Sequence, residues 1–281
     1  MTYGTKSTGA GPLIYKPTQY SKLITRRPIL EKYSKFYVGA EEFIDGDFRY
    51  CLWFNDDDVP EVNGIPEVQN AFEQIRQNRL KSPKMSTQRL AETPHKFGEI
   101  RYRPTDSIIV PSVSSERREY IPMGYLSPDT VISNAAFAIY DAKPWLFALL
   151  TSQMHMAWAR AVGGKMKTDY RYSNTIVYNN FPVPDLSDRQ KQRLTELALR
   201  VLDVREYHCD KTLAQLYDPD LMPDNLRQAH REVDEYVDSL YSKRTYETDE
   251  DRLSDLFARY EEMIAAEEAA KPKKKTRKRK K

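Results

Sequence analysis

The sequence predicts a mixed α/β domain followed by a small all-α helical bundle and a disordered basic tail. Three observations support this fold class. Over residues 29–184, short apolar runs with the two-residue period of strands are interspersed with helical patterns. Over residues 185–266 the apolar residues recur at helical spacing, and residues 271–281 are almost entirely Lys and Arg. At 281 residues, the chain has room for one large or two ordinary domains.

The composition argues against a membrane protein and against a metal site. The longest apolar run, residues 135–140, is far shorter than the roughly 20 residues that a membrane span needs. The chain does not open with a charged and then apolar signal peptide. Its two Cys and four His are scattered without metal-ligand spacing. We therefore expect a soluble, cytoplasmic protein.

Charge divides the chain into three zones. Residues 1–184 carry 23 Lys or Arg against 19 Asp or Glu, residues 185–270 carry 12 against 22, and residues 271–281 carry 9 against none. Basic segments attract polyanions such as nucleic acid, and acidic ones repel them. The first and last zones are therefore the candidates for contact with a polyanion.

The N-terminal part predicts a connector, a hairpin and a helix. Residues 1–28 are rich in Gly, Ser, Thr and Pro at first, which is typical of a linker. Asp45-Gly46 lies between two apolar runs and predicts a hairpin, with a largely buried strand over residues 48–54. Residues 68–80 carry apolar residues on one helical face. The basic side chains that follow suit either phosphate contacts or plain surface: Lys81, Lys84, Arg89, Lys96, Arg101 and Arg103.

A short strand and a polar loop follow. Residues 108–110 are an apolar strand, and the loop after it gathers small hydroxyls and guanidiniums: Ser112, Ser114, Ser115, Arg117 and Arg118. Such side chains bind phosphate oxygens or a guanine edge. A catalytic serine is not expected here, because no His lies nearby in sequence and the G-x-S-x-G pattern is absent.

Residues 152–184 are the most informative stretch. Met154, Trp158 and Val162 form a helical stripe, and Gly163-Gly164 should end the helix in the left-handed conformation. Beyond the glycines, charged and uncharged residues alternate, which predicts one extended strand with Lys165, Lys167, Asp169 and Arg171 on one face and Tyr170 and Tyr172 on the other. Residues 175–178 predict a second strand.

This charged row has two interpretations. Lys donates to guanine O6 and N7 and Asp accepts from cytosine N4, so Lys167 and Asp169 suit the reading of base edges. Arg160 and Arg171 suit the neutralisation of phosphates, which positions a protein on nucleic acid without reading sequence. The alternative is a solvated strand face with internal pairing between Lys and Asp.

The C-terminal zone predicts three helices and a tail. Three apolar stripes, around residues 194–204, 226–240 and 253–260, are separated by Pro-containing and polar breaks. Helices of this kind pack as an antiparallel bundle. Residues 267–281 predict a disordered tail that binds nucleic acid nonspecifically or only aids solubility.

The motifs SQMHMAWARAVGGKMKTDYRYS and IVYNNFPVP, over residues 152–173 and 176–184, resemble the target-recognition part of the MmeI-like family, the type IIL restriction–modification enzymes. The resemblance implies a connector at 1–28, a DNA target-recognition domain at 29–184, a C-terminal helical domain at 185–266 and a tail at 267–281. It also implies that Lys167 and Asp169 read bases. The other expected DNA-binding residues are Ser114, Ser115, Arg117, Arg118, Arg160, Lys165, Tyr170, Arg171 and Tyr172.

The resemblance also implies a function. We expect a sequence-specific DNA recognition module of an S-adenosylmethionine-dependent N6-adenine methyltransferase, with double-stranded DNA as its partner. The family's N-P-P-Y, cofactor-loop and P-D-(D/E)-x-K motifs are absent from the sequence. We therefore expect no catalytic, cofactor or metal residue in this chain, and S-adenosylmethionine in a companion methyltransferase chain. The alternatives are a general RNA- or DNA-binding scaffold and a self-contained enzyme built on Ser114-Ser115 or Glu41-Glu42.

Overall fold

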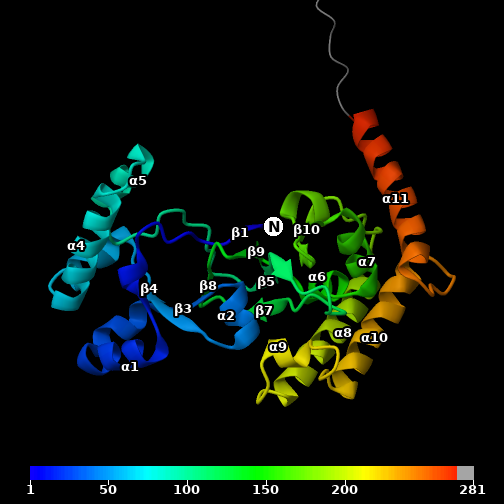
Figure 1. Ribbon diagram of the computed structural model, residues 1–281, viewed down its shortest axis with the longest axis horizontal. Coiled ribbons are helices and arrows are strands. Elements are labelled where there is room, and N and C mark those ends of the chain that lie inside the picture. Colours follow the sequence, from blue (N-terminus) through cyan, green and yellow to red (C-terminus); the bar gives the residue numbers. More distant parts are fainter. Residues whose placement is uncertain (271–281) are drawn as a thin grey trace, which may run out of the picture.

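The computed structural model describes residues 1–270 and shows a mixed α/β region joined to a helical region (Figure 1). The strands are β1 (Thr2–Tyr3), β2 (Ile14–Tyr15), β3 (Ser34–Val38), β4 (Arg49–Leu52), β5 (Ser107–Pro111), β6 (Val113–Ser114), β7 (Gly124–Leu126), β8 (Thr130–Ile132), β9 (Ala136–Tyr140), β10 (Gly164–Met166) and β11 (Asp169–Arg171).

The α-helices are α1 (Pro17–Arg26), α2 (Ala40–Asp45), α3 (Val59–Val62), α4 (Pro66–Leu80), α5 (Met85–Arg89), α6 (Pro144–Leu150), α7 (Gln153–Val162), α8 (Asp188–Tyr207), α9 (Leu213–Leu216), α10 (Asp224–Tyr241) and α11 (Asp249–Ala270). Figure 1 shows α1, α4 and α5 at one end of the molecule and α8 to α11 at the other, with the sheets between them. No helix in residues 1–270 combines the length and apolar character of a membrane span.

Three small sheets build the α/β region. Two have four strands, in the orders β1-β9-β5-β7 and β2-β4-β3-β8, and the third has the order β10-β11-β6. All their pairings are antiparallel except β3 with β8. Residues 1–28, which were expected to be a connector, contribute strands to two of these sheets and the helix α1.

Two of the expected extended segments are helical. Asp45-Gly46 ends helix α2 instead of forming a hairpin, and Gly46 has a φ of 76°. A left-handed glycine serves a helix end as well as a hairpin turn, so the dipeptide alone does not distinguish them. Residues Asn174–Tyr178 form a single π-helical turn, in which the Tyr178 and Asn179 amides donate to the Ser173 and Asn174 carbonyls. The Ser173 hydroxyl caps the turn by accepting from the Ile176 amide.

The helical region confirms the expected helices, which also pack against the α/β region. The apolar stripes of α8 and α10 are buried and the two helices pack together. However, α8 also packs on α6, and α11 packs on α7. The helices therefore complete a core that the α/β region begins. The expected tail starts inside α11, since residues 267–270 are helical, and the rest of it lies outside the described residues.

The hydrophobic interior has two main parts. One lies within the N-terminal half and includes Leu13, Leu52 and Ile75. The other runs without interruption from Ile108 of β5, through Trp158 of α7, to Leu256 of α11. The segment that carries the candidate site therefore shares its core with the C-terminal helices.

Candidate nucleic-acid interface

The candidate reading residues lie on a two-stranded hairpin, not on one strand. Strands β10 and β11 pair with Met166 opposite Asp169, so the chain reverses at Lys167 and Thr168. Lys167 has a φ of 58°, the left-handed conformation that the first central position of a tight hairpin turn needs. A non-glycine residue in this conformation costs roughly 1–3 kcal/mol and is often found at functional sites.

The reversal changes which side chains share a face. Residues paired across two strands point to the same side, as do residues two apart in one strand. Asp169 and Arg171 therefore share one face, Lys165 and Tyr170 share the other, and Lys167 stands at the tip. The predicted row of four charged groups on one face is wrong.

Within the described part of the chain, the cations of the hairpin have no ion-pair partner. Lys165, Lys167 and Arg171 are exposed, and no carboxylate in residues 1–270 lies within ion-pair distance of them. The alternative of internal Lys–Asp pairing is therefore not observed. Asp169 and Tyr170 are half-buried. The tip thus offers donors to an external acceptor, with one carboxylate beside them.

The strand β6 and its loop lie beside the hairpin. Ser114 of β6 pairs with Tyr170 and is buried, whereas Ser115 is half-buried and its hydroxyl accepts from the Arg117 amide. Arg117 forms an exposed ion pair with Asp220, 2.6 Å from Nη2 to Oδ2. Burial lowers the pKa of the Arg118 guanidinium, and nearby carboxylates, Asp169 among them, oppose that shift.

Besides Arg117, two more of the expected DNA-binding residues make contacts within the protein. Arg160 donates to Asp249 Oδ2 at 2.8 Å and to the Glu119 carbonyl at 3.0 Å. Tyr172 is buried, and its hydroxyl lies 2.9 Å from His155 Nε2. These side chains hold helix α7 and the end of the hairpin in place. Sequence reasoning missed His155 as a support. The signal was a polar residue between apolar neighbours in a buried helix.

The basic segment after α4 divides into paired and unpaired groups. Lys96, Arg101 and Arg103 form ion pairs with Asp56, Glu99 and Asp141. Lys81, Lys84 and Arg89 have no ion-pair partner within residues 1–270. They lie on α5 and beside it, at the far end of the molecule from the C-terminal helices (Figure 1).

Helix α7 ends directly before the hairpin, but not by the expected mechanism. Gly163 has a φ of −70° and is extended, not left-handed. A Cβ at this position would lie 2.3 Å from the Ala159 carbonyl oxygen. The glycine is therefore required by close approach, and it lets β10 start immediately after the last turn of α7.

Comparison with known families accounts for nearly the whole described chain. The MmeI target recognition domain matches residues 1–185, and the MmeI C-terminal domain matches residues 186–266. The chain belongs to the MmeI family, through its target recognition and C-terminal domains. The family resemblance inferred from residues 152–184 is thereby confirmed.

Two relatives are similar over almost all of this chain. DNA methyltransferase A of Bacillus subtilis (strain 168) is 42% identical over 261 residues, which is 93% of this chain and 30% of that protein. The solved structure of the type IIL restriction–modification enzyme MmeI in complex with DNA has a TM-score of 0.87 at 37% identity, and covers 94% of this chain and 35% of that chain. The chain thus spans about a third of the length of each relative.

Proposed function

We propose that this chain recognises double-stranded DNA at a specific sequence and directs adenine methylation there. The observation that carries the proposal is the hairpin β10–β11, whose exposed cations have no ion-pair partner among residues 1–270. A two-stranded ribbon fits the major groove of B-DNA, where each base pair presents a distinct pattern of donors and acceptors. The likeness to MmeI, solved in complex with DNA, supports this function.

Within this function the residues have different roles. Lys167 at the tip and Asp169 beside it read base edges by donating to guanine and accepting from cytosine. Lys165 and Arg171 contact phosphates and set the position on the duplex. Ser115, Arg118 and Tyr170 lie next to them and complete the contact surface. Ser114, Arg160 and Tyr172 shape this surface from within the protein.

The chemistry of methylation belongs to a methyltransferase core that uses S-adenosylmethionine. We assign that core to a companion chain of the restriction–modification type, and the present chain aims it. The similarity to a protein called DNA methyltransferase A, of which this chain spans 30%, supports a larger enzyme that contains a methyltransferase part. The motifs expected for N6-adenine transfer do not occur in the 281 residues.

The test is selection from a pool of random-sequence duplex DNA at physiological salt. The full chain and a chain ending at residue 270 are compared, so that nonspecific attraction by the basic segment 271–281 is separated from sequence reading. Enrichment of the same short motif by both proteins is the expected result. Salt-sensitive binding without a motif, lost with residues 271–281, would contradict the proposal and favour a general nucleic-acid scaffold.

A further inference from the structure

The hairpin β10–β11 is held to the protein at two places. Helix α7 precedes β10, separated from it only by Gly163. Strand β6 pairs with β11, through Ser114 opposite Tyr170 and Val113 opposite Arg171. Any part of the molecule that fixes both α7 and the β6 segment also fixes where the hairpin tip stands.

The segment that continues from β6 is anchored in the C-terminal helices. Tyr120 is buried, and its ring stacks on His230 of α10 with ring centroids 4.2 Å apart. Its hydroxyl donates to Asp234 Oδ2, also on α10, at 2.6 Å. This contact joins the β6 side of the hairpin to α10.

The other oxygen of the same carboxylate holds helix α7. The backbone amide of Gln153, the first residue of α7, donates to Asp234 Oδ1 at 2.7 Å. Amides in the first turn of a helix have no partner within the helix, and a negative charge there is favourable. Asp234 therefore binds both attachments of the hairpin at once, one with each oxygen.

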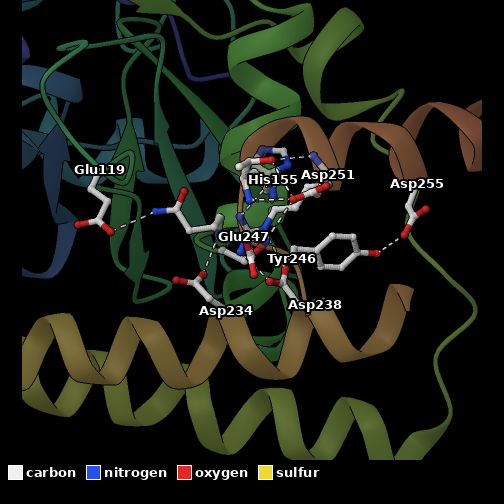
Figure 2. Close-up of polar contacts among 12 residues, drawn as sticks. Glu119, His155, Asp234, Asp238, Tyr246, Glu247, Asp251 and Asp255 are labelled. Carbon is white, nitrogen blue, oxygen red and sulfur yellow. Dashed lines mark hydrogen bonds and ion pairs between the residues drawn. The ribbon is translucent and has the colours of Figure 1, made fainter. Parts of the chain in front are cut away.

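Further contacts join the segment after β6 and helix α7 to the C-terminal helices. Glu119, next to Tyr120, accepts from Arg227 of α10 at 2.6 Å and from the Gln153 side chain at 3.4 Å. The Arg160 guanidinium of α7 bonds to the Glu119 carbonyl and to Asp249 of α11. Figure 2 shows Glu119 and Asp234 with dashed lines for their contacts to Gln153.

We infer that Asp234 is a positioning residue for DNA reading, through which the C-terminal helices fix the hairpin tip against the base edges. This inference rests on the proposed function. Asp234 is only 7% exposed, so it acts through Tyr120 and Gln153 and does not touch DNA. The signal in the sequence is an acid beside the buried apolar stripe of α10, next to Val233.

The chemistry of this site predicts which replacements are tolerated. Burial raises the pKa of Asp234 to about 7. A neutral carboxyl keeps both partners if it accepts from the Gln153 amide and donates to the Tyr120 oxygen. Asn at this position has the same donor and acceptor available. Asp234→Asn should therefore preserve the position of the hairpin, whereas Asp234→Ala removes both contacts and Tyr120→Phe removes only the one on the β6 side.

The experiment measures discrimination rather than binding alone. For the full chain and each variant, affinity is determined for the motif selected by the unmodified protein and for duplexes with one base pair of that motif changed. The folded fraction is measured by circular dichroism, and affinities are corrected for it. Glu235→Ala is the matched control, because Glu235 is the next residue of α10, is exposed, and its side chain makes no hydrogen bond or ion pair within the described residues.

Tyr120→Phe and Asp234→Ala should lower the discrimination ratio by about 2- to 30-fold, the range typical of residues that couple to a site without touching the ligand. Asp234→Asn and Glu235→Ala should retain it. A purely structural role would reduce the folded fraction and leave the discrimination ratio unchanged. This result with Tyr120→Phe would overturn the inference about Asp234 but not the proposed function. A lack of discrimination in the unmodified protein would overturn the proposed function as well.

Discussion

At the scale of single residues, buried polar side chains in this chain hold backbone in place. Arg79 lies on the buried face of α4, where the spacing of Val68, Phe72 and Ile75 predicted it. Its guanidinium donates to four backbone carbonyls, those of Thr8, Leu90, Thr93 and Lys96. The helical spacing placed Arg79 on this face, but only the fold shows that its guanidinium bonds to these carbonyls.

His155 provides a prediction for the dependence of stability on pH. Burial lowers the pKa of its imidazole to about 3, against an ordinary value of 6.5. Its stabilising contribution is therefore complete above pH 6.5 and is lost as the pH falls towards 3, because the unfolded chain takes up the proton first. Relative to His155→Gln, the native chain should lose about 1 kcal/mol of unfolding free energy per pH unit in this interval.

Urea unfolding at several pH values between 3 and 7 measures this difference. The comparison of the two proteins cancels the other groups that titrate in the same range. Parallel pH profiles for the native chain and His155→Gln would show that His155 is not held neutral in the folded protein.

At the scale of elements, the sequence predicted the helices and strands whose apolar pattern fits only one type of secondary structure. The apolar face of residues 68–80 became α4, and the run at 108–110 became the centre of β5. The hairpin was missed because its turn contains neither Gly nor Asn, and a two-residue turn leaves the alternation along the chain intact. The face that each charged residue occupies is set by this turn, so it could not be predicted from spacing.

The left-handed turn residue gives an element-scale prediction. Replacing Lys167 by Gly relieves the unfavourable φ of 58° and should raise the unfolding free energy by up to about 1 kcal/mol. Lys165→Gly is the control, because it removes the same side chain from a strand position without a positive φ, and it should lower stability. Both are measured by urea unfolding. A stability loss of similar size in both variants would contradict a strained turn at Lys167.

At the scale of the whole molecule, the division into two family domains does not coincide with the division of the hydrophobic core. The family domains meet between residues 185 and 186. The larger core crosses that boundary and includes Leu194, Val201, Leu226 and Val233. Sequence patterns showed the two zones by composition and charge, but not the shared interior, because contacts between distant segments leave no periodic signal.

The shared core predicts that residues 1–185 alone are unstable. Burial of each Leu or Val side chain stabilises the folded state by about 1.5–3 kcal/mol. The loss of several such side chains is comparable to the whole unfolding free energy of a typical domain, about 5–15 kcal/mol. A fragment ending at residue 185 should bind a hydrophobic dye, and the part of it that contributes to the larger core should unfold without a cooperative transition. Residues 1–270 should unfold cooperatively and bind little dye. A fragment that unfolds as cooperatively as the longer chain would contradict this account.

If the hairpin tip reads bases, an exchange of the charges at Lys167 and Asp169 should change the recognised sequence. Lys167→Asp is combined with Asp169→Lys, and base preference is measured by selection and by competition among single-base variants of the motif. Asp188→Lys with Lys191→Asp on α8 is the matched control, because it exchanges the same residue types in an ion pair outside the hairpin. We expect a changed preferred base at one or two positions of the motif for the hairpin exchange, and an unchanged motif for the control. An unchanged motif in the hairpin exchange, with full affinity, would contradict base reading by the hairpin tip.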